Sequence, residues 1–210
     1  MFKLYLKRIL EVARQGDATE ESYYPILKEL LENYKKNAIV TVQPKKTEAG
    51  NPDFRVWDGK QKITGYIEAK TPDRNLDDAE RTGQIKRYKN TFKNFLLTNF
   101  LEFKLYKDGS LIEGIRIVDP VSIYSLKGIP PIKDEEGFKN ILEKFFSFSF
   151  PKITSAQSLA LELAKRTRFL RDEVISEELR EEEKNGIKKI LGFYEAFQKY
   201  LIRGLTKQQF

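Results

Sequence analysis

Two neighbouring stretches decide the fold of this chain: residues 50–57, with the sequence GNPDFRVW, and residues 63–70, with the sequence ITGYIEAK. Both are short, rich in β-branched and aromatic residues, and alternate apolar with polar side chains, which is typical of β-strands. The pair Asp58-Gly59 between them is a strong signal for a tight turn that joins antiparallel strands. The sequence therefore predicts a hairpin whose second strand carries Glu68 and Lys70 near its end.

The same alternation assigns a face to each polar residue of this hairpin. Residues two apart in a strand point to the same side, so Glu68 and Lys70 share a face, and Asp53 joins them because its apolar neighbours face away. A four-residue hairpin loop places Asp53 opposite Tyr66 and diagonal to Glu68, whereas a two-residue turn places it opposite Thr64. Diagonal neighbours lie roughly 7–8 Å apart, close enough for two carboxylates to reach one ion. In either register we expect both acids on one side of the sheet.

The composition limits the chemistry of such a site. The 210 residues include neither Cys nor His, which excludes thiolate nucleophiles, imidazole bases and the usual zinc sites. Two converging carboxylates without softer ligands favour Mg²⁺, for which Mn²⁺ can substitute. A net charge of +7, from 38 Lys and Arg against 31 Asp and Glu, favours a polyanionic partner such as nucleic acid. The pattern fits phosphodiester cleavage, in which a cation neutralises phosphate charge and Lys70 contacts the attacking water or the phosphate.

Periodicity outside the hairpin predicts the rest of the architecture. We expect a mixed α/β domain over residues 1–119, a linker or irregular excursion over residues 120–136, and a helical segment over residues 137–210. No stretch approaches the ~20 apolar residues of a membrane span, and the N-terminus lacks the pattern of a signal peptide, so a cytoplasmic protein without a membrane partner is expected. The elements predicted in the first domain are two helices before residue 37, strands over residues 38–42, 54–57, 62–70, 96–98 and 103–106, and a basic helix over residues 79–95.

The hairpin residues resemble a known motif. Residues 51–53 (Asn-Pro-Asp), followed after fourteen residues by residues 68–70 (Glu-Ala-Lys) at the end of an apolar strand, resemble the motif of the PD-(D/E)XK nuclease superfamily. Gln84 and Tyr88 match the QxxxY motif of its RecB-like branch, and their spacing of four places them on one helical face. The resemblance implies a restriction-endonuclease-like core, in which helices flank a central mixed sheet, and a metal-dependent DNA endonuclease activity.

The resemblance also implies roles for individual residues. Many members carry an extra acid early in the preceding helix, which is either Glu20 or Glu21 here, and we prefer Glu21. The implied metal ligands are Asp53, Glu68 and the carbonyl of Ala69. The residues implied to act around the metal are Lys70, which positions or activates the water, Glu21, which assists through the metal shell, and Gln84 and Tyr88, which orient the site or the DNA.

Double-stranded DNA is the implied substrate, and the predicted basic helix abuts the proposed site. Such a charge run is often only a solvated face, but its position here favours contacts with DNA phosphates. The residues expected to make these contacts are Arg81, Lys86, Arg87, Lys89 and Lys93.

A second, less specific resemblance concerns the C-terminal part of the chain. The predicted helix over residues 155–179 is similar to the connector that follows the nuclease domain in single-chain, Type IIG-like restriction-modification enzymes. Those enzymes continue into a methyltransferase and a target-recognition region, whose motifs do not occur in this sequence. The chain is therefore expected to be either a part of such an enzyme or a stand-alone nuclease.

Two other functions remain open at this point. A structure-specific or repair nuclease, such as a junction resolvase or an exonuclease, uses the same chemistry on other DNA substrates. A non-catalytic DNA-binding module on a nuclease fold is the alternative from a different class, and the intact Asp53, Glu68 and Lys70 argue against it.

Overall fold

The computed structural model of the chain describes residues 1–60, 62–123, 128–148, 156–169 and 190–200, together with residues 175, 179, 182, 185 and 186. The chain divides into two compact units, Met1–Phe150 and Pro151–Phe210. The first unit contains the β-sheet and every residue that the sequence assigns to a site.

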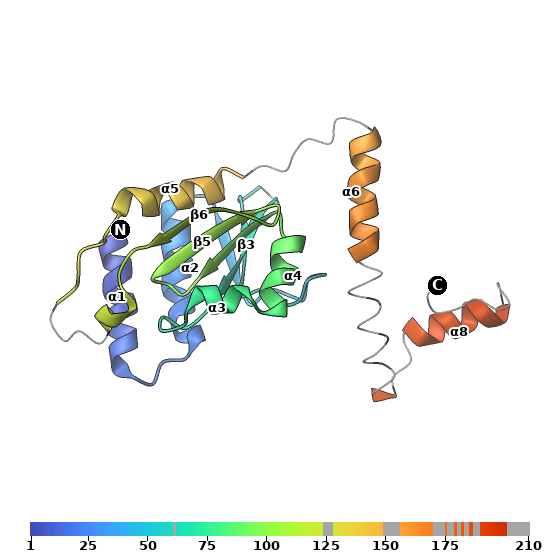
Figure 1. Cartoon of the computed structure of the whole chain (residues 1–210), viewed down its shortest axis with the longest axis horizontal. Coiled ribbons are helices and arrows are strands. Elements are labelled where there is room, and N and C mark those ends of the chain that lie inside the picture. The colour runs from blue at the N-terminus through green and yellow to red at the C-terminus, as the bar shows by residue number, and fades with distance from the viewer. Residues whose placement is uncertain are drawn as a thin grey trace. The chain divides into compact units, whose positions relative to one another are not determined.

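A six-stranded mixed sheet forms the centre of the first unit, and its strands follow one another in chain order (Figure 1). Neighbouring strands are antiparallel except for the central pair, β3 and β4, which is parallel. A parallel pair requires a crossover connection, which the helices between these two strands supply. The expected α/β class is therefore confirmed. The strands are β1 (Ile39–Val42), β2 (Phe54–Trp57), β3 (Ile63–Ala69), β4 (Asn94–Thr98), β5 (Glu102–Lys107) and β6 (Ser110–Arg116).

The main hydrophobic core lies between one face of the sheet and three helices, α1 (Phe2–Gln15), α2 (Tyr24–Tyr34) and α5 (Glu135–Phe146). Each helix presents an apolar stripe at spacings of three and four residues. The apolar alternate residues of the strands pack against these stripes. Phe54 and Ile67, which flank the polar residues of the hairpin, are completely buried in this core. Their burial fixes which way the intervening polar side chains point.

The other face of the sheet is covered by α3 (Leu76–Glu80) and α4 (Gly83–Thr91), drawn in green in Figure 1. The prediction of one continuous helix over residues 79–95 is wrong. Thr82 interrupts it, because its side chain accepts a hydrogen bond from the Ile85 amide and caps a new helix. The helix also ends earlier than expected, and β4 begins at Asn94.

The first unit extends further along the chain than the sequence indicated. Strand β6 was not expected, and the short helix η2 (Pro120–Ile123) lies in the predicted linker. Helix α5 was assigned to the C-terminal helical segment, but Phe138, Ile141, Leu142 and Phe145 of this helix are completely buried in the core of the first unit. The compact unit thus ends at Phe150, whereas the expected domain ended at residue 119.

The second unit contains helices α6 (Ala156–Phe169) and α8 (Ile190–Tyr200). They lie within the predicted helical segment, and most of residues 170–189 fall outside the described part of the chain. Across the residues that the structure describes, we find no helix with the length and apolar character that a membrane span requires.

Candidate active site

The register of the β2–β3 hairpin brings the two predicted acids level with each other. Phe54 pairs with Ile67 and Arg55 with Tyr66, so the same register continued by one residue sets Asp53 opposite Glu68. Both registers considered from the sequence are therefore wrong, because the loop is longer, with Trp57 opposite Ile63, and a bulge between Val56 and Trp57 shifts the pairing by one more residue. The predicted shared face is kept, and the two acids lie closer than the diagonal arrangement requires.

Asp53 is held from two directions. Its Oδ2 atom accepts a hydrogen bond of 2.7 Å from the backbone amide of Ala69, which ties the carboxylate to the end of β3. The hydroxyl of Tyr24 lies 2.6 Å from Asp53 Oδ1 and 2.9 Å from Glu20 Oε1. Since a hydroxyl has a single proton, it can donate to only one of these carboxylates at a time. Tyr24 thus joins the N-terminal end of α2 to the acid of the Asn-Pro-Asp motif.

Lys70 lies among the acids. Its amine is 2.8 Å from Glu68 Oε1 and 3.9 Å from Glu20 Oε2. Burial works to lower the pKa of Lys70, but the carboxylates around it outweigh this effect, and the pKa is raised above its ordinary value. The lysine is therefore a cation and a hydrogen-bond donor in this arrangement.

Glu68 carries the largest electrostatic cost of the site. Its side chain is 2 % exposed, and burial together with the negative charge of Asp53 raises the pKa of Glu68 to about 8, against the opposing effect of Lys70. Burial also raises the pKa of Glu20. With three carboxyl groups around one lysine, Glu68 keeps its proton up to about pH 8, and a cation bound beside it would favour release of that proton.

The donor set fits a divalent metal ion such as Mg²⁺. Glu68 Oε2 is buried and has no hydrogen-bond partner, so a carboxylate oxygen is free for a ligand from outside the chain. All available donors are hard oxygen atoms, which Mg²⁺ prefers. Within the described part of the chain, no three acidic side chains already converge as a complete metal site, so Asp53 and Glu68 would need a backbone carbonyl or water as further ligands.

The structure brings Glu20 into the cluster, and the preference for Glu21 is not supported. Glu20 contacts both Tyr24 and Lys70, whereas the carboxylate of Glu21 points to the side-chain amide of Gln43 at 3.4 Å. Both acids occupy the first turn of the short helix η1 (Glu20–Tyr23), where successive residues point in different directions. Glu21 instead lines an open hollow of about 460 Å³ next to Tyr24.

Gln84 and Tyr88 lie on the same face of α4, next to the cluster. The amide of Gln84 is 3.2 Å from the Tyr88 hydroxyl, and burial raises the pKa of Tyr88 to about 12. The acids Asp53 and Glu68 add to this rise, which reflects their proximity. Gly50, with φ of 121°, packs so closely that a Cβ atom would lie 3.3 Å from the Tyr88 hydroxyl. The loop before Asp53 is therefore shaped against the tyrosine of the QxxxY motif.

The five basic residues predicted to contact DNA occupy different environments. The amine of Lys89 lies 3.3 Å from Glu80 Oε1 and 4.9 Å from the centre of the Tyr106 ring. These contacts hold α4 against its neighbours. Arg81 is highly exposed and 3.6 Å from Asp78. The remaining residues are Lys86, which is exposed, and Arg87 and Lys93, which are half-buried.

Tyr24 is the site residue that the sequence analysis missed. A signal for it was present, because Glu20 and Tyr24 are four residues apart and such residues share a helical face. The tyrosine was overlooked because it is the first residue of α2, next to Tyr23 and the apolar residues that dominate the helical pattern.

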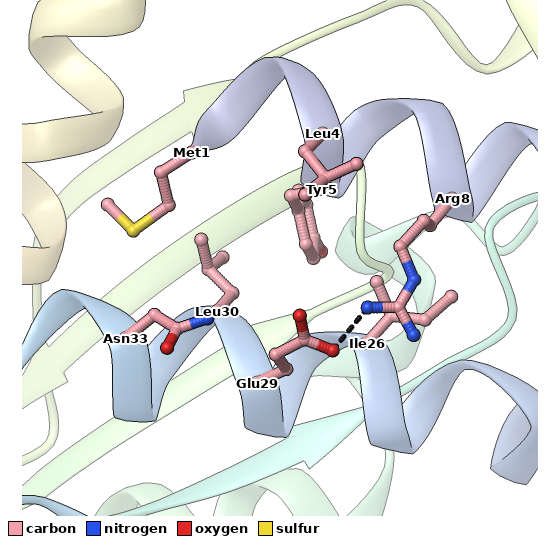
Figure 2. A pocket seen from close by; sticks show the side chains of 8 residues that line it. All are labelled: Met1, Leu4, Tyr5, Arg8, Ile26, Glu29, Leu30 and Asn33. Carbon is pink, nitrogen blue, oxygen red and sulfur yellow. Dashed lines mark hydrogen bonds and ion pairs between the residues drawn. The ribbon is translucent and has the colours of Figure 1, made fainter.

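A second cavity, of about 210 Å³, lies away from these residues. It is formed between α1 and α2, where the side chains of Leu4, Tyr5 and Leu30 surround it and an ion pair between Arg8 and Glu29 crosses its side (Figure 2). None of the acids of the cluster lines it, so it is separate from the candidate active site.

Comparisons with known proteins give a fold likeness. No family model matches the chain, and no curated protein sequence matches it. Among solved structures, a chain of the cryo-EM structure of a DrdV–DNA complex superimposes with a TM-score of 0.53 at 19% sequence identity. The superposition covers 98% of this chain and 19% of that chain. The likeness shows a shared fold, and this chain spans about a fifth of the length of its structural neighbour.

Proposed function

We propose that the protein is a metal-dependent DNA endonuclease of the PD-(D/E)XK type. The observation that carries the proposal is the placement of Glu68: a buried carboxylate with one unpartnered oxygen, level with Asp53 and 2.8 Å from Lys70. A buried carboxyl group whose pKa is strongly raised, next to a second acid, is typical of functional sites. The likeness to a chain solved in a complex with DNA supports DNA as the substrate.

In this proposal Asp53, Glu68 and the carbonyl of Ala69 hold Mg²⁺, for which Mn²⁺ can substitute. The metal would supply charge neutralisation at the scissile phosphate and lower the pKa of a water molecule. Lys70 donates hydrogen bonds and orients the attacking water or the phosphate. Glu20 and Tyr24 keep Lys70 and Asp53 in place.

Gln84 and Tyr88 support the same site from α4. Tyr88 packs on the loop that precedes Asp53, and Gln84 directs its amide towards the tyrosine hydroxyl. Lys86, Arg87 and Lys93, together with Arg81, are proposed to contact DNA phosphates near the site.

A restriction-modification role is the larger context that we propose. The neighbour in the DrdV–DNA complex is a much longer chain, and this chain corresponds to 19% of it. Following the sequence resemblance to Type IIG-like enzymes, we propose a methyltransferase and a target-recognition region as partners of the nuclease unit.

The test is cleavage of supercoiled plasmid and linear duplex DNA by the purified protein with Mg²⁺, with Mn²⁺ and with EDTA. We expect cleavage only with the divalent ions, and a loss of about a hundredfold or more on Asp53→Ala or Lys70→Ala. Glu11→Ala, at an exposed position of α1, is the matched control and should cleave at the parental rate. Parental cleavage by Lys70→Ala with an intact fold would contradict the role of that lysine.

A further inference from the structure

A row of side chains continues from the candidate active site along the same face of the sheet. Arg55 and Trp57 follow Asp53 at intervals of two residues, and Tyr66 lies opposite Arg55 on β3. The guanidinium carbon of Arg55 is 5.6 Å from the centre of the Tyr66 ring and 5.8 Å from the centre of the Trp57 ring. We call these three residues the β2 strip.

The charge of Arg55 has no acidic counterpart. Among the described residues it forms no ion pair with a carboxylate, whereas other arginines do, for example Arg116 with Glu102 at 2.6 Å. The guanidinium donates a hydrogen bond to the carbonyl of Lys45 at 3.3 Å and interacts with the Tyr66 side chain, and its Nε atom is buried without a partner. A half-buried guanidinium without a carboxylate partner, next to two aromatic rings, is suited to an anionic and planar ligand.

The aromatic members are held in position without being covered completely. The indole nitrogen of Trp57 is 3.3 Å from the Thr41 hydroxyl, which fixes the orientation of the ring. Tyr66 stacks on Phe92, the residue that follows α4, with ring centres 4.0 Å apart. Trp57, Tyr66 and Arg55 are all half-buried.

The strip has dimensions that suit a nucleic-acid strand. At the ~3.3 Å rise per residue of a strand, Trp57 lies about 13 Å from Asp53 along β2. At ~3.4 Å per nucleotide, this distance corresponds to about four stacked nucleotides. Strand-binding proteins that do not depend on base pairing combine a positive groove with aromatic rings on which bases stack.

We propose that the β2 strip binds unpaired nucleotides of the DNA substrate, with Arg55 contacting the backbone and Trp57 stacking on a base. The inference rests on the proposed nuclease function and names the substrate class of that site: duplex DNA with a single-stranded extension up to about four nucleotides from the cleaved phosphate. Fully paired DNA buries its base faces and has no base to offer to Trp57.

The sole tryptophan of the chain provides a direct measurement. We would titrate the full chain in EDTA, to prevent cleavage, with a 20-nucleotide single strand, an abasic strand of equal length and a blunt 20-base-pair duplex. Trp57 emission should be quenched by the single strand, and not by the abasic strand or the blunt duplex. Trp57→Ala and Arg55→Gln should each weaken single-strand binding about tenfold.

Two variants separate a specific effect from a general one. Trp57→Phe keeps an aromatic ring and should retain most of the affinity that Trp57→Ala loses. Arg116→Gln removes an equal charge from the far edge of the sheet and should bind the single strand like the parent protein. Cleavage of tailed and blunt duplexes with Mg²⁺ completes the comparison, and the parent protein should prefer the tailed duplex.

The outcomes distinguish the two proposals. If the protein cleaves DNA with Mg²⁺ but binds and cuts tailed and blunt duplexes equally, with unchanged Trp57 emission, the strip does not bind unpaired nucleotides and the nuclease proposal stands. If it neither binds nor cleaves any of these DNA molecules, both proposals fail.

Discussion

At the scale of single residues, the candidate active site is an unbalanced group of charges. Glu68, Asp53 and Glu20 surround a single lysine, and one oxygen of Glu68 is buried without a partner. Folding alone does not favour such an arrangement, because each buried carboxylate loses hydration. Residues that violate a local rule in this way are where function is expected.

Replacing Glu68 tests this cost directly. The pKa of Glu68 is raised from 4.5 to about 8 in the folded protein, so the folded state keeps a proton that the unfolded state releases. Between pH 4.5 and 8 the parent protein therefore becomes progressively less stable than Glu68→Gln, which stays neutral. We expect the variant's melting temperature in EDTA to exceed the parental one by a margin that grows to a few degrees between pH 5 and 8.

Melting curves at several pH values check this prediction. Asp53, Glu20 and Lys70, which face Glu68, are present in both proteins, so the comparison isolates the replaced carboxyl. A difference in melting temperature that is constant, or that shrinks as the pH rises, would contradict the raised pKa of Glu68.

Glu20 and Glu21 provide a matched pair of neighbouring acids. Glu20 contacts Tyr24 and Lys70, whereas Glu21 contacts the side chain of Gln43. Glu20→Gln should therefore lower the cleavage rate about tenfold, as loss of a supporting partner of a metal site does. Glu21→Gln should stay within about twofold of the parent. Initial rates on one duplex substrate decide between them, and the reverse order would return Glu21 to the site.

At the scale of elements, the sequence predicted most of the sheet and missed its irregularities. Alternation identified the faces of β2 and β3 because Phe54 and Ile67 must enter the core. The register depended on a bulge near Trp57, which periodicity does not reveal. Strand β6 was not predicted because its side chains are largely exposed at the edge of the sheet and show little apolar alternation. The break between α3 and α4 depends on the hydroxyl of Thr82, which accepts the hydrogen bond that starts α4.

The candidate site was predictable to a similar degree. Asp53, Glu68 and Lys70 were found because residue type and spacing are visible in the sequence. The choice between Glu20 and Glu21 depends on how a single helical turn is oriented, and that orientation is set by packing against residues far away in the chain.

Helix α5 belongs to the core of the first unit, and its contribution to the free energy of unfolding can be measured. Phe138 is completely buried and packs on the rings of Phe2 and Phe103, with ring centres 4.8 Å apart in both pairs. Phe138→Ala should lower the free energy of unfolding by about 3–5 kcal/mol. Leu4→Ala, at a position 55% exposed, should change it by less than about 0.5 kcal/mol. Urea unfolding of both variants tests this, and a loss for Phe138→Ala as small as that for Leu4→Ala would place α5 outside the core.

At the scale of the whole molecule, the active-site cluster and its support lie within the first unit. The acids, Lys70 and the QxxxY helix come from the first 91 residues, and the core that holds them is completed by α5. A fragment of residues 1–150 should therefore unfold cooperatively and keep metal-dependent cleavage. A fragment of residues 1–119 lacks the fully buried side chains of α5 and should not fold. Calorimetry of the two fragments checks both statements, and a folded shorter fragment would restore the boundary expected from the sequence.

The aromatic rings that close the core also bring the two ends of the first unit together. Phe2 and Phe146 both stack on Tyr34, with ring centres 6.1 and 5.9 Å away. The beginning of α1 and the end of α5 are thus neighbours in space, although more than 130 residues separate them in the chain. A short peptide bridge could join these two points, and new termini could open at the exposed turn around Gly59. We therefore expect a circular permutant of the first unit, with its original ends joined and its new termini near Gly59, to form the same core.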